Sequence, residues 1–270
     1  MNLFQGRQRP SSLALYTMAY IAFLYLPVLM IPLFSLNDSI YVSFPLRGLT
    51  TQWYVGLWHN DGLHAAFRNS LKVGLCAASI STLCGTLTAY AVTRRSSWPV
   101  KALARLALAP MAVPGIVTGV AILVVINLST LGPSLIAVTI GHISVCLPLV
   151  IVVMKSRFQS YPASLEEAAY DLGASEWQTL VRVSLPVVAP GIIASFLLAF
   201  TLSFDEFIVT FFLTGTEPTL PIFIWNQLRF SSRLPEILAL GSVILLGSII
   251  LVLVAEFIRH RGEKRQFGVP

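Results

Sequence analysis

Charged residues are scarce in this chain. They make up 11% of its 270 residues, whereas hydrophobic residues make up 56%. Soluble globular domains carry roughly 25% charged residues, so the composition excludes an ordinary soluble domain. Apolar residues gather in runs of about 20, the length that a helix needs to cross a bilayer. The sequence therefore predicts an all-α, polytopic membrane protein.

Motifs for catalysis or nucleotide binding are also missing. The sequence contains no G-x-x-x-x-G-K-[S/T] loop, no H-E-x-x-H pair and no G-x-S-x-G elbow. No basic run with interleaved aromatic residues indicates a nucleic-acid partner. The scattered histidines are interpreted as structural: His59, His64, His142 and His260. We predict a chain without catalytic residues, metal ligands or a cofactor of its own.

Cysteine is rare as well. Cys76, Cys84 and Cys146 lie in apolar segments, and none belongs to a C-x-x-C pair. We expect all three to be small, buried apolar side chains rather than metal or redox groups.

Six apolar runs have the length of transmembrane helices. The first is too long for the apolar part of a signal peptide and precedes no small-residue cleavage site, so we expect it to be a retained span. The predicted spans are approximately 13–36, 69–92, 103–128, 131–154, 188–213 and 235–258. The corresponding divisions are a segment 1–12, a transmembrane domain 13–258 with a long loop at 37–67 and a polar loop at 160–186, and a tail 259–270.

Basic residues orient these spans. With both termini in the cytoplasm, thirteen lysines and arginines fall inside: Arg7, Arg9, Arg94, Arg95, Lys101, Arg105, Lys155, Arg157, Arg182, Arg259, Arg261, Lys264 and Arg265. Five fall outside: Arg47, Arg68, Lys72, Arg229 and Arg233. Because cytoplasmic loops carry the excess of basic residues, this bias predicts cytoplasmic termini and a cytoplasmic 160–186 loop.

The stretch 166–186 (EEAAYDLGASEWQTLVRVSLP) is the longest polar interval of the apolar region. Its first half predicts a short amphipathic helix, with Ser164 as N-cap and Glu167 completing a capping box. Ala168, Ala169 and Leu172 give one small apolar face, and Gly173 ends the helix. Such a helix is too short and too charged to span a bilayer, so it lies on the membrane surface or docks into a partner.

This stretch resembles the EAA loop of ABC importer permeases. The family pattern is Glu-Ala-Ala, three residues, Gly, nine residues, Ile-x-Leu-Pro. Here it is met by Glu167-Ala168-Ala169, Gly173 and Val183-x-Leu185-Pro186, with Val183 at the usual Ile position. An ordinary surface helix between two spans is the alternative interpretation.

The resemblance implies a bacterial inner-membrane permease of the type I ABC importer fold. In that family the loop forms a cytoplasmic coupling helix that seats in a cleft of the ATP-binding subunit. The implied coupling residues are Glu166, Glu167, Ala168, Ala169, Asp171, Leu172 and Gly173. The implied partners are a second permease, two ATP-binding subunits that bind ATP and Mg²⁺, and an extracytoplasmic substrate-binding protein.

Two adjacent acids, Asp205 and Glu206, fall well inside the predicted fifth span. Each costs about 2.5–3.5 kcal/mol near the centre of a membrane helix, and intramembrane acids are functional candidates by default. In one interpretation at least one of them lines the substrate path and attracts a cationic substrate. In the other they pair with a base such as Lys72 or lie in a wet crevice for structural reasons.

Further segments resemble spermidine/putrescine importer permeases. They are Ala199-Phe200-Thr201-Leu202-Ser203-Phe204-Asp205-Glu206-Phe207, Thr214-Gly215, Leu220-Pro221, Pro235-Glu236-Ile237, Ala239-Leu240 and Trp53-Tyr54. The resemblance implies polyamine import. Glu206 stands where those permeases often have Asp, and Arg229 and Arg233 are unexpected beside an entrance for a polycation. Another amine-containing solute, such as an amino acid, an opine or an aminophosphonate, therefore stays open.

Two other classes also remain at this stage. An ion-coupled secondary transporter often shows inverted repeats, and this sequence shows none. An intramembrane enzyme would need a second catalytic acid or a metal cluster, and Glu256 is the only other deep acid.

Overall fold

The computed structural model describes residues 12–94 and 97–266, which are helical with short connections and contain no β-strand. In chain order the elements are α1 (Ser12–Ser35), α2 (Gln52–Trp58), α3 (Asp61–Arg94), α4 (Trp98–Leu108), η1 (Ala109–Ala112), α5 (Gly115–Leu128), α6 (Leu135–Ser160), α7 (Ser164–Asp171), α8 (Glu176–Thr179), η2 (Leu180–Ser184), α9 (Leu185–Phe204), α10 (Ile208–Leu213), α11 (Leu220–Gln227), η3 (Ser231–Arg233) and α12 (Leu234–Gln266). They form two compact units: residues 1–60 with 224–270, and residues 61–223.

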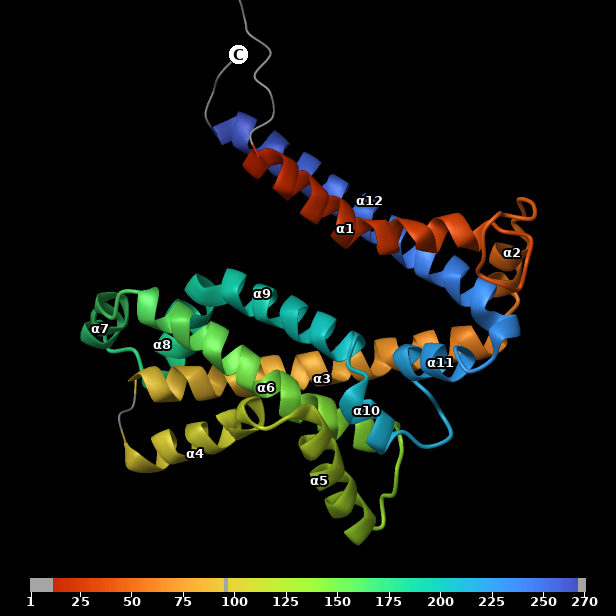
Figure 1. Ribbon diagram of the computed structural model, residues 1–270. Helices are drawn as coiled ribbons and strands as arrows, with labels where there is room; N and C mark the ends of the chain where they lie inside the picture. Colours follow the sequence, from red (N-terminus) through yellow and green to blue (C-terminus); the bar gives the residue numbers. More distant parts are fainter. Residues whose placement is uncertain (1–11, 95–96, 267–270) are drawn as a thin grey trace, which may run out of the picture. The chain divides into compact units, whose positions relative to one another are not determined.

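In the first unit, α1 and α12 run side by side in opposite directions (Figure 1). The contact is polar at one point: the Ser35 hydroxyl lies 2.6 Å from the Tyr54 hydroxyl and 3.2 Å from the Ser242 hydroxyl, and Ser35 and Ser242 are fully buried. The Asn60 amide donates to Glu236 at 2.7 Å. Buried hydroxyls that satisfy one another are a common way to join helices in lipid.

The second unit is built around α3, α6 and α9, which lie side by side (Figure 1). Small residues allow this approach: a Cβ added to Gly85 of α3 would lie 2.6 Å from Val150 Cγ1 of α6. A Cβ added to Gly74 would lie 3.1 Å from the Phe200 ring of α9. Because lipid tails are as apolar as leucine, helices in a membrane associate through such close packing rather than through the hydrophobic effect.

The predicted all-α, polytopic class is confirmed. Among the described residues, five helices are long and apolar enough to cross a membrane, and a sixth crossing follows if α4 and α5 count as one bent span. The span predicted over about 103–128 is not one straight helix, because the chain bends by 116° between Trp98–Ala112 and Gly115–Leu128. Pro110 lies in η1 and Pro114 caps α5, so two donors are missing where the helix would continue, and Val113 is extended ahead of Pro114.

Other boundaries differ from the sequence interpretation. The loop predicted over 37–67 contains α2 and the first turns of α3. The fifth span ends at Phe204, not at Leu213. Cys146 is buried as expected, but Cys76 and Cys84 are exposed on the outer side of α3, where a sulfhydryl can face lipid or a partner.

Several predicted features lie outside the described residues. These are the segment 1–11, Arg95 and the last residues of the tail, 267–270. The side chain of Glu256 and those of the basic residues of the 259–266 segment lie outside them as well.

Candidate functional site

Helix α7 carries the predicted coupling residues, but it begins differently from the prediction. Ser164 is its first residue, Ala163 is the N-cap, and no side chain caps it. The carbonyls of Pro162 and Ala163 accept the first free N–H groups, from Leu165, Glu166 and Glu167, so no side-chain cap is needed. The capping box forms instead at α8, where Ser175 and Gln178 bond reciprocally.

Gly173 ends the helix, as the sequence predicted. Its φ of +84° is a left-handed conformation that glycine adopts without strain. The Gly173 N–H donates to Tyr170 O at 2.8 Å, and the Ala174 N–H donates to Ala169 O at 3.0 Å. This pair of bonds is a Schellman motif, which satisfies carbonyls at the helix end.

The two adjacent glutamates of α7 point in different directions. Glu166 is 4% exposed. Its Oε2 lies 2.8 Å from Arg94 Nε, and its Oε1 accepts from the Ser184 hydroxyl at 2.8 Å. Glu167 is exposed. Neighbours on a helix point about 100° apart, which lets one carboxylate face the bundle and the other face outward.

The outward face of α7 gathers most of the predicted coupling residues. Glu167, Ala168, Asp171, Leu172 and Gly173 are all exposed, and Ala169 is half-buried. Leu172 is 90% exposed and directly follows the exposed Asp171. An exposed apolar tip with small neighbours is suited to insertion into a partner's groove.

A polar hollow of about 520 Å³ adjoins the inner side of this helix. Its lining residues are Tyr90, Arg94, Ala163, Glu166, Glu167, Tyr170 and Glu176. At its margin the Arg94 guanidinium lies 5.2 Å from the centre of the Tyr161 ring, a cation–π distance. Burial raises the pKa of Tyr161, so its hydroxyl stays protonated.

Asp205 and Glu206 do not lie within a continuous helix, contrary to the prediction. Asp205 is the C-cap of α9, and the chain leaves the helix there before α10 begins at Ile208. Asp205 is exposed and Glu206 is half-buried. Glu206 Oε1 accepts from the Val209 N–H at 3.0 Å, so this carboxylate satisfies a donor at the start of α10. Within the described residues neither acid pairs with Lys72, which is exposed.

His142 of α6 holds the break together, and the sequence interpretation assigned it no such role. It is 1% exposed. Its Nδ1 lies 2.7 Å from the Ser203 hydroxyl of α9, and its Nε2 lies 2.7 Å from the Thr210 hydroxyl of α10. Thr210 in turn donates to the Glu206 carbonyl at 2.8 Å.

The three hydrogen bonds that link Ser203, His142, Thr210 and the Glu206 carbonyl fix which group donates in each. Thr210 uses its single hydrogen toward Glu206, so it accepts from His142, whose Nε2 therefore carries the proton. The His142 Nδ1 then accepts from Ser203. The sequence did contain a signal for this contact. His142 lies in an apolar run, and the neighbouring predicted span carries the serine and threonine that could hydrogen-bond to it.

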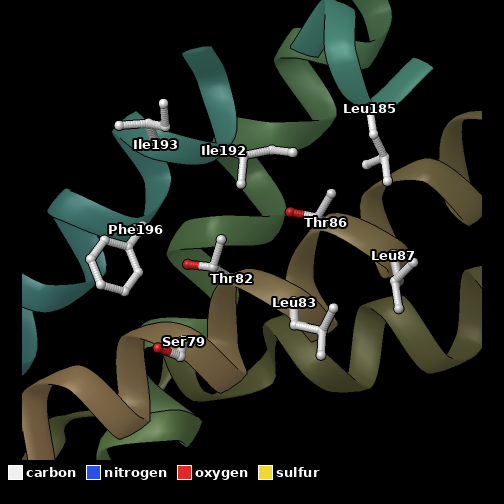
Figure 2. Close-up of a pocket in the computed structure, with 9 residues that line it drawn as sticks. All are labelled: Ser79, Thr82, Leu83, Thr86, Leu87, Leu185, Ile192, Ile193 and Phe196. Atoms are coloured by element: carbon white, nitrogen blue, oxygen red, sulfur yellow. The ribbon is translucent and has the colours of Figure 1, made fainter. Parts of the chain in front are cut away.

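An apolar groove of about 420 Å³ runs between α3 and α9 (Figure 2). Figure 2 shows Leu83, Leu87 and Phe196 along its walls, with the Thr82 and Thr86 side chains between the two helices. Both threonine hydroxyls are buried without a hydrogen-bond partner in the described structure. In the part of the chain that the structure describes, no three His, Cys, Asp or Glu side chains converge as metal ligands would.

Comparisons with known proteins agree with one another. Residues 81–267 match the family model described as "Binding-protein-dependent transport system inner membrane component". The chain is 33% identical over 251 residues to the spermidine/putrescine transport system permease protein PotC of Escherichia coli (strain K12), covering 93% of this chain and 94% of that protein. It is also 33% identical over 255 residues to the putrescine transport system permease protein PotI of the same organism, covering 90% and 89%.

A solved structure extends the comparison to the fold. A chain from the crystal structure of a bacterial ABC transporter involved in the import of the acidic polysaccharide alginate superposes with a TM-score of 0.67. The match covers 92% of this chain and 94% of that chain at 17% sequence identity. The helical architecture is therefore that of an ABC importer permease.

Proposed function

The chain belongs to the family of binding-protein-dependent transport system inner membrane components, and we propose that it is the permease subunit of an ATP-driven polyamine importer. The observation that supports the substrate class is similarity over nearly the whole chain to permeases named for spermidine and putrescine. Family membership sets aside an ion-coupled secondary transporter and an intramembrane enzyme.

The complex would contain four further subunits or copies. They are a second permease that shares the translocation path, two ATP-binding subunits that hold ATP and Mg²⁺, and an extracytoplasmic substrate-binding protein. Both termini and α7 lie on the cytoplasmic side, which the excess of basic residues on that side supports. In this proposal the chain does not hydrolyse ATP itself. It converts the motion of its ATP-binding partners into opening of the translocation path.

Coupling would pass through the exposed face of α7. The small side chains of Ala168 and Ala169 permit a partner's surface to approach the helix backbone, and Leu172 supplies an apolar anchor. Glu167 and Asp171 lie on the same face and suit a basic cleft. Glu166 has a different part, because both of its oxygens are bonded inside this chain.

Substrate contact would involve Asp205 at the α9–α10 break. Its carboxylate is exposed, and a broken helix in a membrane protein is tolerated where it lines a water-filled cavity. Glu206 contributes negative charge beside it while also holding the start of α10. A protonated amine of a polyamine would be attracted by this local negative charge.

Another amine-containing solute is the second candidate. The observation that favours it is the arginine pair after α11, because Arg229 and Arg233 would repel a polycation. One of the two is partly neutralised: Arg233 Nη1 lies 3.3 Å from Glu236 Oε2.

The test is ATP hydrolysis by the complex, co-purified with its ATPase and second permease and reconstituted in lipid. Binding protein loaded with spermidine or putrescine should stimulate hydrolysis and drive uptake. Stimulation by an amino acid and none by either polyamine would support the second candidate. Failure to assemble with an ATP-binding subunit would contradict the importer itself.

A further inference from the structure

We propose that Arg94 and Glu166 form a buried ionic joint through which α7 moves three membrane spans together. The inference rests on the proposed function, since it concerns how the stroke of the ATPase enters this subunit. It assigns Arg94 and Glu166 as positioning residues that need not touch the ATPase or the substrate. We call the group of Arg94, Glu166, Ser184 and Tyr161 the joint.

Four elements meet at the joint, one through each residue. Arg94 is the last residue of α3, and Glu166 lies in the first turn of α7. Ser184 immediately precedes α9, and Tyr161 immediately follows α6. The joint therefore connects α7 to the ends of the same three helices that pack as the centre of this unit.

The geometry makes Glu166 the hub. One carboxylate oxygen forms an ion pair with Arg94 at 2.8 Å and the other accepts a hydrogen bond from Ser184 at 2.8 Å, so α7 is held to α3 by charge and to the start of α9 by a hydrogen bond. Arg94 rests against the Tyr161 ring and adds α6. Each charge also complements a helix end: Arg94 lies at the C-terminus of α3, and Glu166 lies near the N-terminus of α7.

Burial makes the pair hard to separate. The side chains of Arg94 and Glu166 are 18% and 6% exposed. A buried charge that loses its partner is strongly unfavourable, so a displacement of α7 moves Arg94 with it rather than leaving the two ions apart. The residues just before α9, Leu180–Ser184, form a π-helical turn, a form common at functional sites.

The outward glutamate separates this role from docking. Glu167 is exposed and available to a partner, whereas Glu166 is turned into the bundle. The two neighbouring glutamates of α7 thus have different roles. Glu167 contacts the ATP-binding subunit, and Glu166 transmits the resulting movement of α7 to the membrane helices.

The decisive variant is Arg94→Gln in the assembled complex, reconstituted with its ATPase and with binding protein loaded with spermidine. Without the ion pair α7 can move while α3 does not follow. We expect uptake per ATP hydrolysed to fall by about tenfold while stimulated hydrolysis changes little. Glu166→Gln should act in the same direction. The exchange variant R94E/E166R should recover uptake relative to either single charge reversal, R94E or E166R, because it restores opposite charges.

Arg105→Gln is the matched control, since Arg105 is an exposed arginine of the adjacent helix α4. It should leave the ratio of uptake to hydrolysis unchanged. An unchanged ratio of uptake to hydrolysis in Arg94→Gln, whether both rates fall together or neither falls, would overturn the proposal. If Arg94→Gln does not assemble, Arg94→Lys and Ser184→Ala keep the question open to measurement: both should lower the ratio by a few-fold, and two normal ratios would refute the proposal.

A substrate-free readout separates this inference from the substrate assignment. In the wild-type complex, ATP binding should alter amide hydrogen exchange in α7 and in the last turn of α3. In Arg94→Gln only α7 should respond. An unresponsive α3 end in the wild type would refute the joint, whereas a wild type that responds but takes up no spermidine would refute the polyamine assignment alone.

Discussion

The second unit contains two buried polar clusters of opposite character. At the end of α3, Glu166 and Arg94 form an ion pair supported by Ser184. Within the bundle, His142 joins Ser203 and Thr210 through neutral hydrogen bonds. Counting along α6 at 1.5 Å per residue, His142 lies about 28 Å from Tyr161, so the two clusters lie toward opposite ends of this helix.

The difference between the clusters follows from the free-energy cost of burying a charge. Near the membrane surface an ion pair can form, because water and the interface lower the desolvation penalty. His142 is 1% exposed and its two partners are neutral hydroxyls, so an unpaired charge there would be costly, and the contact between helices is made by groups that need not ionise. Asp205 and Glu206 lie where the helix has broken, and Asp205 is exposed.

Gly173→Arg should have the largest effect, because it alters the docking face of α7 near the ionic cluster. An L side chain in a left-handed conformation costs about 1–2 kcal/mol, and the new guanidinium would lie on the docking face beside Leu172. We expect uptake at background level with normal insertion, measured by vesicle uptake and by the amount of ATPase co-purified. Gly132→Arg is the control, because Gly132 has φ +61° and lies in the α5–α6 loop. Normal uptake by Gly173→Arg would contradict the coupling role of α7.

Glu166→Leu tests the ionic cluster energetically. It leaves Arg94 buried without its partner, and such losses cost about 3–5 kcal/mol. Thermal unfolding of the subunit in detergent should show a clearly lowered midpoint. The double variant R94L/E166L, in which both ions are absent, should be more stable than Glu166→Leu. A double variant at least as unstable as the single one would show that packing, not charge, dominates.

His142→Leu tests the neutral cluster and should cost less. It leaves the Ser203 donor unsatisfied at a cost of about 1–3 kcal/mol, whereas Thr210 keeps its bond to the Glu206 carbonyl. His142→Gln can donate to one hydroxyl and accept from the other, so it should be milder. The same unfolding assay measures both. A larger loss for His142→Leu than for Glu166→Leu would reverse the comparison between the clusters.

Asp205→Asn should have the smallest effect. The carboxylate is exposed, so it contributes a screened attraction to a cationic substrate rather than a structural bond. We expect uptake to weaken by about fivefold through a higher KM, with assembly unchanged. Thr201→Val, one turn earlier on the exposed side of α9, is the control. Unchanged uptake kinetics in Asp205→Asn would remove Asp205 from the path.

Composition and periodicity were enough to predict the class, most of the spans and the position of α7, because bilayer thickness and helix geometry impose them on the sequence. The EAA spacing located the exposed face of α7, and Gly173 ended it as predicted. The bends at Pro110 and at Asp205 were missed because a window of apolar residues carries no information about local backbone breaks. The inward turn of Glu166 was missed because its partner Arg94 is 72 positions away in the sequence.

The close contacts at Gly74 and Gly85 have a mechanical consequence. They press α3 against both α6 and α9 with no space for a side chain between them, so the three helices resist bending as one beam. Helix α3 has 34 residues, which is a length of about 50 Å. Over that length, if the helix tilts by about 5° about its Arg94 end, its other end moves by about 4 Å. A small rotation at the Arg94 end is thereby amplified by leverage alone, without any change of conformation along the helix.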